Sequence, residues 1–266
     1  MVGIDRVTYS NKSLPMRVVT LLACAAFVLS ASLQAQTFRI GVELQPYMPY
    51  SNVEDGRYLG YGRELLDAFA AHAGHEFIYQ PLPVRRLLSD FLHDRVDFKY
   101  PDNPRWNADI KAGHSIHYSH TAAPAVDGLL VKPQYLGQGK ARILRLGTQR
   151  GFTPWPYLQD IEAGHILLIQ ANQIDSLLAM ALNDRVDAVY LNPQVVAHQL
   201  GLMGKSGALV FDPALDHVND HYFLSSIRHP QVIEQFNRFL QEQAEQVEAL
   251  KLRHGIIDPA GDTPTH

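Results

Sequence analysis

The sequence predicts an α/β fold of two similar lobes, each a mainly parallel sheet flanked by helices. The main observation is an internal repeat: residues 87–98 and 177–188 are identical at seven of twelve positions, at a constant offset of 90. The same register also matches Tyr100 with Tyr190. An offset of this length is far longer than a solenoid unit, so it indicates two related lobes rather than an array.

Each copy of the repeat predicts a helix, a tight polar turn and a short strand. Apolar residues recur at i, i+3, i+4, i+7 and i+8 from Val84 in the first copy and from Ile174 in the second, which is one face of a helix. The strands that follow are expected at Val96–Tyr100 and Val186–Leu191.

The remaining elements alternate between strands and helices, which is typical of parallel sheets covered on both faces. Leu65, Leu66, Phe69 and Ala73 predict an amphipathic helix between the first two strands. The chain is expected to cross between lobes at Gly128–Pro133 and to return at His221–Ile227. The other expected elements are strands at 38–43, 77–80, 143–148 and 166–170, a polar stretch at 134–140, one final helix from Pro230 to Leu252, and a frayed tail from Pro259 to His266.

The N-terminus predicts a secretory signal peptide over residues 1–35. An apolar run over 18–33 follows Arg17 and ends at small Ala35. The run is short for a transmembrane anchor, and a buried N-terminal helix is the other alternative. Cys24 could instead mark a lipoprotein cleavage site, although the apolar run continues beyond it. Cleavage after Ala35 leaves 231 residues without cysteine, so the exported protein depends on its hydrophobic core and not on disulfides.

The composition argues against several classes of function. The exported chain has 20 basic and 26 acidic residues and no basic runs, which disfavours nucleic acid and anionic membrane surfaces as partners. We expect no metal and no cofactor, because the histidine spacings alone are weak signals and no complete nucleotide-binding motif occurs. The chain also has no G-x-S-x-G nucleophile motif.

The ordered motifs of the chain resemble those of the family-three extracellular solute-binding proteins of amino-acid-type ABC importers. The resemblance runs from about Phe38 to Gly255 and rests on the loop Gln45–Tyr50, the helix start Gly60–Leu65, the two repeat copies and the segment Gly147–Gly151. It implies a two-lobed periplasmic binding protein of type II with two hinge strands. The C-terminal helix would pack on the first lobe, and the ligand would lie between the lobes. The expected domains are 36–131 with 224–266 for lobe 1, and 132–223 for lobe 2.

The resemblance also implies a set of ligand-binding residues. Tyr47 matches the aromatic residue that stacks on the ligand, and Tyr50 belongs to the same loop. Either Arg105 or Lys99 would bind a ligand carboxylate, because a guanidinium fork or an ammonium can pair with it. Asn192 stands where the family has the acid that pairs the ligand's ammonium, so a carboxylate or neutral polar solute is expected over a zwitterion. The other candidates are Asp102, Asn103, Thr148, Arg150 and Thr153.

The expected function is periplasmic binding of a small polar solute, amino-acid-like or carboxylate, by closure of the two lobes. The expected partner is an ABC permease in the inner membrane, and the protein is expected to be a monomer and not an enzyme. Two alternatives remain open. One is a ligand-sensing lobe for a membrane receptor. The other is an enzyme like the cyclohexadienyl dehydratases, with Glu43, Asp102 or Glu64 as the acid.

Overall fold

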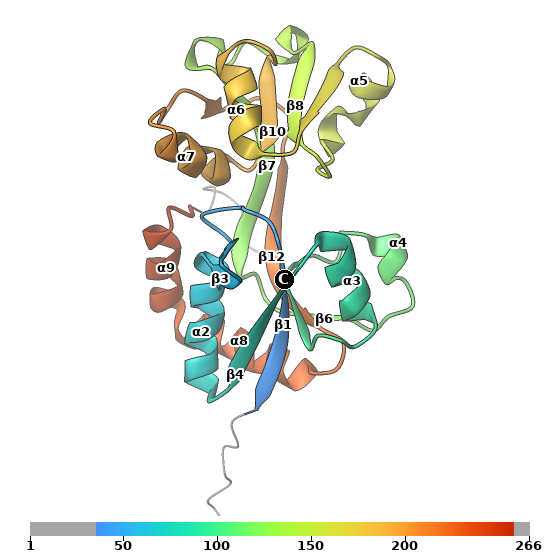
Figure 1. Cartoon of the computed structure of the whole chain (residues 1–266), viewed down its shortest axis with the longest axis vertical. Coiled ribbons are helices and arrows are strands. Elements are labelled where there is room, and N and C mark those ends of the chain that lie inside the picture. The colour runs from blue at the N-terminus through green and yellow to red at the C-terminus, as the bar shows by residue number, and fades with distance from the viewer. Residues whose placement is uncertain (1–35, 258–266) are drawn as a thin grey trace, which may run out of the picture. The chain divides into compact units, whose positions relative to one another are not determined.

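Ten strands form one hydrogen-bonded sheet in the computed structural model, which describes residues 36–257 (Figure 1). Eight of them follow the order β4-β1-β5-β12-β7-β10-β8-β9. The outer parts, β4-β1-β5 and β10-β8-β9, are parallel, and the central β12 and β7 are antiparallel to their neighbours. The predicted α/β fold of two mainly parallel halves is therefore confirmed. The predicted signal peptide and the tail from Pro259 lie outside the described residues.

Lobe 1 is built on the three parallel strands near the N-terminus. Figure 1 shows α2 and α9 on one side of this sheet and α3 on the other. The predicted strands and helices are confirmed, with ends shifted by a few residues. The elements are β1 (Thr37–Glu43), α2 (Tyr61–Ala73), β4 (Glu76–Leu82), α3 (Val84–Leu92), β5 (Phe98–Asp102), the short α4 (Ala108–Lys111) and β6 (His117–Tyr118), and the hairpin β2 (Asn52–Glu54) and β3 (Arg57–Leu59).

Lobe 2 repeats this arrangement with the next part of the chain. Figure 1 shows α6 and α7 on one side of its sheet and α5 on the other. Its inner strand Ala188–Leu191 is apolar and buried, as expected of a parallel sheet covered on both faces, whereas the edge strand Leu167–Ala171 is partly exposed. The elements are β8 (Arg145–Gln149), α5 (Leu158–Glu162), β9 (Leu167–Ala171), α6 (Ile174–Leu182), β10 (Ala188–Leu191), α7 (Pro193–Leu202) and β11 (Val210–Phe211).

Two long strands connect the lobes. β7 (Ala123–Val131) runs out of lobe 1 and β12 (Val218–Ser226) runs back. They pair in antiparallel fashion through five residue pairs, from Val218 with Asp127 to Tyr222 with Ala123. Both strands begin earlier than predicted. β7 includes Asp127 within an otherwise apolar run, and β12 includes the polar residues Asn219 and Asp220 before His221.

The two repeat copies have the same local structure in their own lobes. Asp94 and Asp184 both adopt the left-handed conformation in the turn, with φ of 58° and 57°. The turn then pairs with the first strand of its lobe: the Asp97 N–H donates to the Arg39 carbonyl at 2.8 Å, and the Asp187 N–H donates to the Arg145 carbonyl at 2.8 Å. The prediction that the repeat marks equivalent positions is confirmed.

The C-terminal segment packs on lobe 1 as two helices, so the prediction of one helix was wrong. α8 (Pro230–Glu242) and α9 (Ala244–Arg253) meet at Gln243, whose backbone leaves the helical region. The break turns the chain and lets both helices pack against α2. Phe69 of α2 contacts Phe236 and Phe239 of α8 at ring-centroid distances of 5.0 and 5.6 Å. No helix within residues 36–257 is long and apolar enough to cross a membrane.

Candidate functional site

The loop after β1 holds Tyr47 and Tyr50 rigidly against the start of α2. The Tyr47 N–H donates to the Ser51 carbonyl at 2.8 Å, and the first N–H groups of α2 are bound by carbonyls of the loop. Gly60 makes this approach possible, because its φ is 97° and an added Cβ would lie 2.9 Å from the Tyr50 carbonyl oxygen. Both tyrosines are buried, with exposed fractions of 6% and 4%.

These tyrosines belong to an aromatic cluster that includes residues of both lobes and of β12. We define the aromatic cluster as Tyr47, Tyr50, Trp106, Phe152 and Tyr222. Tyr47 stacks on Phe152 of lobe 2 at 5.7 Å between ring centroids. Tyr222 of β12 meets Tyr50 edge-on at 5.1 Å and Trp106 at 5.8 Å. A ligand held here would contact the two lobes at once, which is what coupling between binding and closure requires.

Asn192 makes the second contact between the lobes. Its Oδ1 caps α7 by accepting hydrogen bonds from the N–H groups of Gln194 and Val195 at 2.9 and 3.3 Å. Its Nδ2 donates to the Tyr50 hydroxyl oxygen at 3.5 Å, and the residue is fully buried. Asn192 therefore contacts Tyr50 of the other lobe, but its carbonyl oxygen is already committed to the helix.

Lys99 is bound within a buried ion cluster at the end of β5. Its Nζ donates to Asp102 at 3.0 Å, and Lys111 donates to the same Oδ1 at 2.7 Å. The Ser225 hydroxyl donates to the other Asp102 oxygen at 2.7 Å. Burial alone would raise the pKa of Asp102, but the two lysines outweigh it and lower the pKa below its ordinary value. Lys99 is thus paired within its own lobe.

Arg105 is paired as well, with an acid that the sequence analysis did not consider. Its guanidinium lies 2.6 Å from Asp220 Oδ1 and is 68% exposed. Asn103 donates to the same Asp220 oxygen at 2.6 Å and accepts the Arg105 N–H at 2.9 Å. The loop after β5 is therefore tied to β12, and both candidate cations have a carboxylate partner.

Asp127 of β7 and Glu43 of β1 are carboxyls with raised pKa values near the aromatic cluster. Burial, together with the negative charge of Asp220, raises the pKa of Asp127 to about 7, although a hydrogen bond with Tyr47 opposes the rise. Its Oδ1 is buried and has no hydrogen-bond partner within the described residues. Burial also raises the pKa of Glu43, against the attraction of Lys99 and a hydrogen bond from Gln45.

For the three remaining lobe 2 candidates the structure shows local contacts or solvent exposure. The buried Thr148 hydroxyl donates to the Tyr190 carbonyl at 3.0 Å, which fixes β8 to β10. Arg150 donates to Asn172 at 2.7 Å on the exposed surface, and Thr153 is exposed. Their visible contacts are structural.

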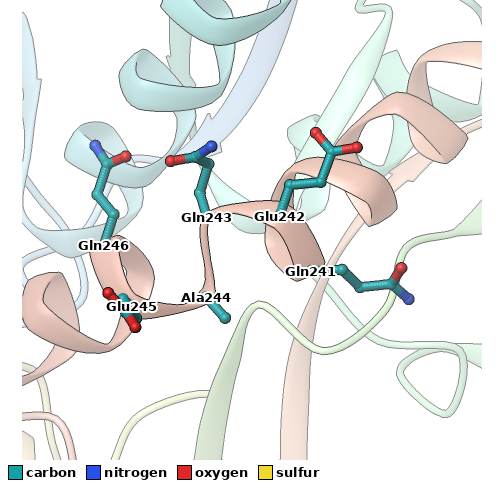
Figure 2. A pocket seen from close by; sticks show the side chains of 6 residues that line it. All are labelled: Gln241, Glu242, Gln243, Ala244, Glu245 and Gln246. Atoms are coloured by element: carbon teal, nitrogen blue, oxygen red, sulfur yellow. The ribbon is translucent and has the colours of Figure 1, made fainter.

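Two of the hollows on the described surface are compared as ligand sites. One of about 370 Å³ lies beside the Tyr47 loop and includes residues of both lobes: Pro46, Met48, Asn52, Glu54, Gln149, Gln173, Ile174, Asp175, Val195, His198, Gln199 and Leu202. The other, of about 440 Å³, follows one stretch of chain from Gln241 to Gln246. Figure 2 shows its side chains pointing in several directions and not toward a common point. The first hollow is therefore the better candidate for a ligand site.

Sequence reasoning missed Trp106, Asp127, Phe152, Asp220 and Tyr222. For one of them a signal was present: Asp127 is a lone acid in the apolar run Ala123–Val131, whereas Asp220 lies between Asn219 and His221 in the polar first half of β12. A charge in an otherwise apolar strand is costly unless it is paired or functional. Such an acid is therefore a candidate site residue on physical grounds.

Comparison with known proteins supports the fold at low sequence identity. No protein-family model matches the chain. Cyclohexadienyl dehydratase of Pseudomonas aeruginosa is 33% identical over 90 residues, which is 30% of this chain and 34% of that protein. The match thus spans about a third of the curated relative.

Solved structures match over most of the chain. The second substrate-binding domain of GlnP from Lactococcus lactis, in an open conformation, has a TM-score of 0.62 at 12% identity, covering 85% of this chain and 98% of that one. An ancestral amino-acid-binding protein, a precursor of cyclohexadienyl dehydratase, gives a TM-score of 0.62 at 17% identity, with 82% of this chain and 94% of that one covered. A periplasmic His/Glu/Gln/Arg/opine family-binding protein from Silicibacter pomeroyi, in complex with lysine, gives 0.61 at 16% identity with 85% and 100% covered. The fold is that of the two-lobed amino-acid substrate-binding proteins.

Proposed function

We propose that this protein binds a small polar organic solute by closing its two lobes around it. The observation that carries the proposal is the aromatic cluster, in which Tyr47 of lobe 1 stacks on Phe152 of lobe 2 beside the two crossing strands. Aromatic rings suit such a solute because they dehydrate one face of it without requiring a hydrogen-bond partner.

The lobes in this proposal keep the boundaries expected from the sequence. Lobe 1 is 36–131 with 224–266, and lobe 2 is 132–223. β7 and β12 support these limits, since both connections between the halves run through them. Open α/β sheets bind ligands beyond the carboxyl ends of their strands, and here Glu43, Asp102 and Asn192 lie at or just after those ends.

We further propose that the protein acts in the periplasm as a monomer and delivers its solute to an ABC permease of the inner membrane. The solved structures with this fold include a substrate-binding protein of an amino acid ABC transporter, at a TM-score of 0.60 and 16% identity. The predicted signal peptide supports export.

A thermal-shift and scattering experiment tests the proposal. The purified protein is screened against amino acids, organic acids, amines and short peptides. A ligand at a hundred times its Kd should stabilise the fold by about 2.7 kcal/mol and compact the protein in small-angle scattering.

Two variants locate the binding site. Phe152→Ala removes the ring that stacks on Tyr47 and should weaken binding about tenfold. Trp155→Ala removes a ring that is 68% exposed three residues later and should leave binding unchanged. Equal loss in both variants, or a ligand that binds without compaction, would contradict closure on the aromatic cluster.

An enzyme related to the dehydratases is the second candidate. The observation in its favour is the pair of carboxyls Glu43 and Asp127, whose raised pKa values suit a general acid. The test is turnover: release of water and carbon dioxide from a cyclohexadienyl acid by the purified protein, lost in Glu43→Gln or Asp127→Asn. Stoichiometric binding without product would leave the solute-binding function.

A further inference from the structure

The charged groups near the two strands that connect the lobes differ in whether they have a partner of opposite charge. Lys99 is bound by Asp102 at 3.0 Å, and Arg105 is bound by Asp220 at 2.6 Å. Each candidate cation therefore has a carboxylate at contact distance. Asp127 has no cation among the groups that shift its pKa, and its Oδ1 is buried without a hydrogen bond from any described residue.

The groups around Asp127 do not neutralise it. Asp220 on the neighbouring β12 adds negative charge, and Tyr47 from the loop after β1 supplies a neutral hydrogen bond. Tyr222 of β12 and Tyr190 of β10 are also close enough for its charge to raise their pKa values. His217, just before β12, is turned to its own chain, with Nδ1 2.9 Å from the Leu215 carbonyl oxygen.

The hollow beside the Tyr47 loop is a separate space whose lining does not include Asp127, but it has the same charge character. Gln149 is only 8% exposed, and its Oε1 has no hydrogen-bond partner within the described residues. The same hollow is bordered by the carboxylates Glu54 and Asp175, from lobe 1 and lobe 2 respectively. Its visible charges are thus acidic on both sides.

We propose that the solute is an organic cation, whose ammonium group binds Asp127 beside the rings of Tyr47 and Tyr222. This inference rests on the proposed function and names its class of ligand. A carboxylate oxygen that is buried without a hydrogen bond, as Oδ1 of Asp127 is, is costly, and a cation in the closed cleft removes that cost. Tyrosine rings attract cations through their electron-rich faces, so the same site can hold an amine or a quaternary ammonium. The carboxylate ligand expected from Lys99 and Arg105 is not what these charges favour.

The proposal requires Asp127 to be ionised when the ligand binds. The affinity for a cation should be highest at pH 8 and should fall as the pH drops below about 7, by up to tenfold for each unit. Replacing Asp127 with asparagine should remove this dependence, since an amide does not titrate.

Calorimetry on the purified protein tests the proposal with four probes at pH 8: tetramethylammonium, putrescine, glutamine and succinate. The two cations should bind more tightly than glutamine and succinate, and their relative affinities distinguish a quaternary ammonium site from an amine site. Asp127→Asn should weaken cation binding at least tenfold, whereas Asp127→Glu, which keeps the charge, should retain most of it. Asp184→Asn is the matched control, because Asp184 is an exposed acid of the repeat turn whose left-handed conformation asparagine also adopts.

The outcomes separate this inference from the proposed function. Compaction with succinate or glutamine but not with either cation would overturn the cation site and leave solute binding intact. Cation binding that is equally strong in Asp127→Asn, with an unchanged melting temperature, would overturn the role of Asp127. Absence of binding by every probe and by the wider solute screen would overturn both.

Discussion

The two copies of the helix–turn–strand unit share the same local structure and packing, which we call the frame, and differ at the residue where the strand ends. Asp102 and Asn192 occupy matching positions 90 residues apart, and both are fully buried. Asp102 neutralises two lysines, whereas Asn192 caps α7 and contacts Tyr50. The repeat has thus kept the residues that hold the unit together and changed the residue at the end of the strand.

The shared frame is visible in the packing of two glycines. An added Cβ on Gly41 of β1 would lie 2.4 Å from Leu87 Cδ1, and one on Gly147 of β8 would lie 2.8 Å from Leu177 Cδ1. The two leucines are themselves 90 residues apart in the repeat. The first strand of each lobe therefore packs against its copy in the same way.

The largest expected difference in stability between the copies comes from replacing the residue at which they differ, Asp102 or Asn192, with alanine. Asp102→Ala leaves Lys99 and Lys111 buried without a countercharge and should cost about 3–5 kcal/mol. Asn192→Ala removes a helix cap and should cost about 1 kcal/mol. Urea denaturation of both variants measures the two losses, and equal losses would mean that the two positions do the same structural work.

Substituting Gly41 or Gly147 should reduce stability by less than Asp102→Ala does, and the two glycine variants should resemble each other. Gly41→Ala and Gly147→Ala both overpack the helix of the repeat, which costs about 1–3 kcal/mol. Gly41→Ala should be the more damaging of the two because its contact is closer. A gain of stability in either variant would break the equivalence of the two frames.

Replacing Asp97 or Asp187, the aspartates near the end of each repeat copy, should lower the stability of the protein by a similar amount. The loss at Asp187 should depend on pH. Asp97 accepts the Arg39 N–H and Asp187 accepts the Arg145 N–H, each at 2.8 Å, so replacing either with asparagine should cost about 1.5–3 kcal/mol. Burial alone would raise the pKa of Asp187, but hydrogen bonds from Arg145 and from Leu144 outweigh it and lower the pKa below 3.8.

The sign of this pH dependence follows from the lowered pKa. The contribution of Asp187 is fully present above pH 3.8 and is lost as the pH falls through the lower folded value. The gap in stability between wild type and Asp187→Asn should therefore narrow below pH 4 in denaturation curves. A gap that widens in acid would contradict the assignment.

The smallest effect on stability should come from making the copies alike. Asn192→Asp keeps an N-cap residue at the start of α7, where a negative charge is favoured, so stability should change by less than about 1 kcal/mol. The added charge should shift ligand preference toward solutes with an ammonium group, including α-amino acids. Calorimetry with glutamine and putrescine measures the shift, and Gln194→Glu supplies a charge control on the same helix.

The frame was predictable because it depends on local pattern. The apolar spacing from Val84 and from Ile174 gave both helices, and the offset of 90 gave the two lobes. The break at Gln243 was not predictable in this way, because the apolar spacing continues through it and the turn depends on packing against α2.

The site was only partly predictable because charge pairing depends on distant residues. Tyr47, Tyr50 and Asn192 were found from motif order and do lie together. Arg105 meets Asp220, which is 115 residues later in the chain, and no spacing rule indicates that contact. Phe152 was missed for the same reason, since its partner Tyr47 belongs to the other lobe.

The five-pair ladder between β7 and β12 limits how this protein can respond to a solute. Two crossing strands that are hydrogen-bonded to each other cannot slide independently, so relative motion of the lobes is reduced to bending or twisting of one ribbon. Ligand binding would then change one quantity, the angle between the two lobes. A fluorescent dye pair on matching exposed positions, through Arg86→Cys and Ser176→Cys, would report that angle as one distance. Site-selective labelling is possible because no cysteine occurs after residue 35.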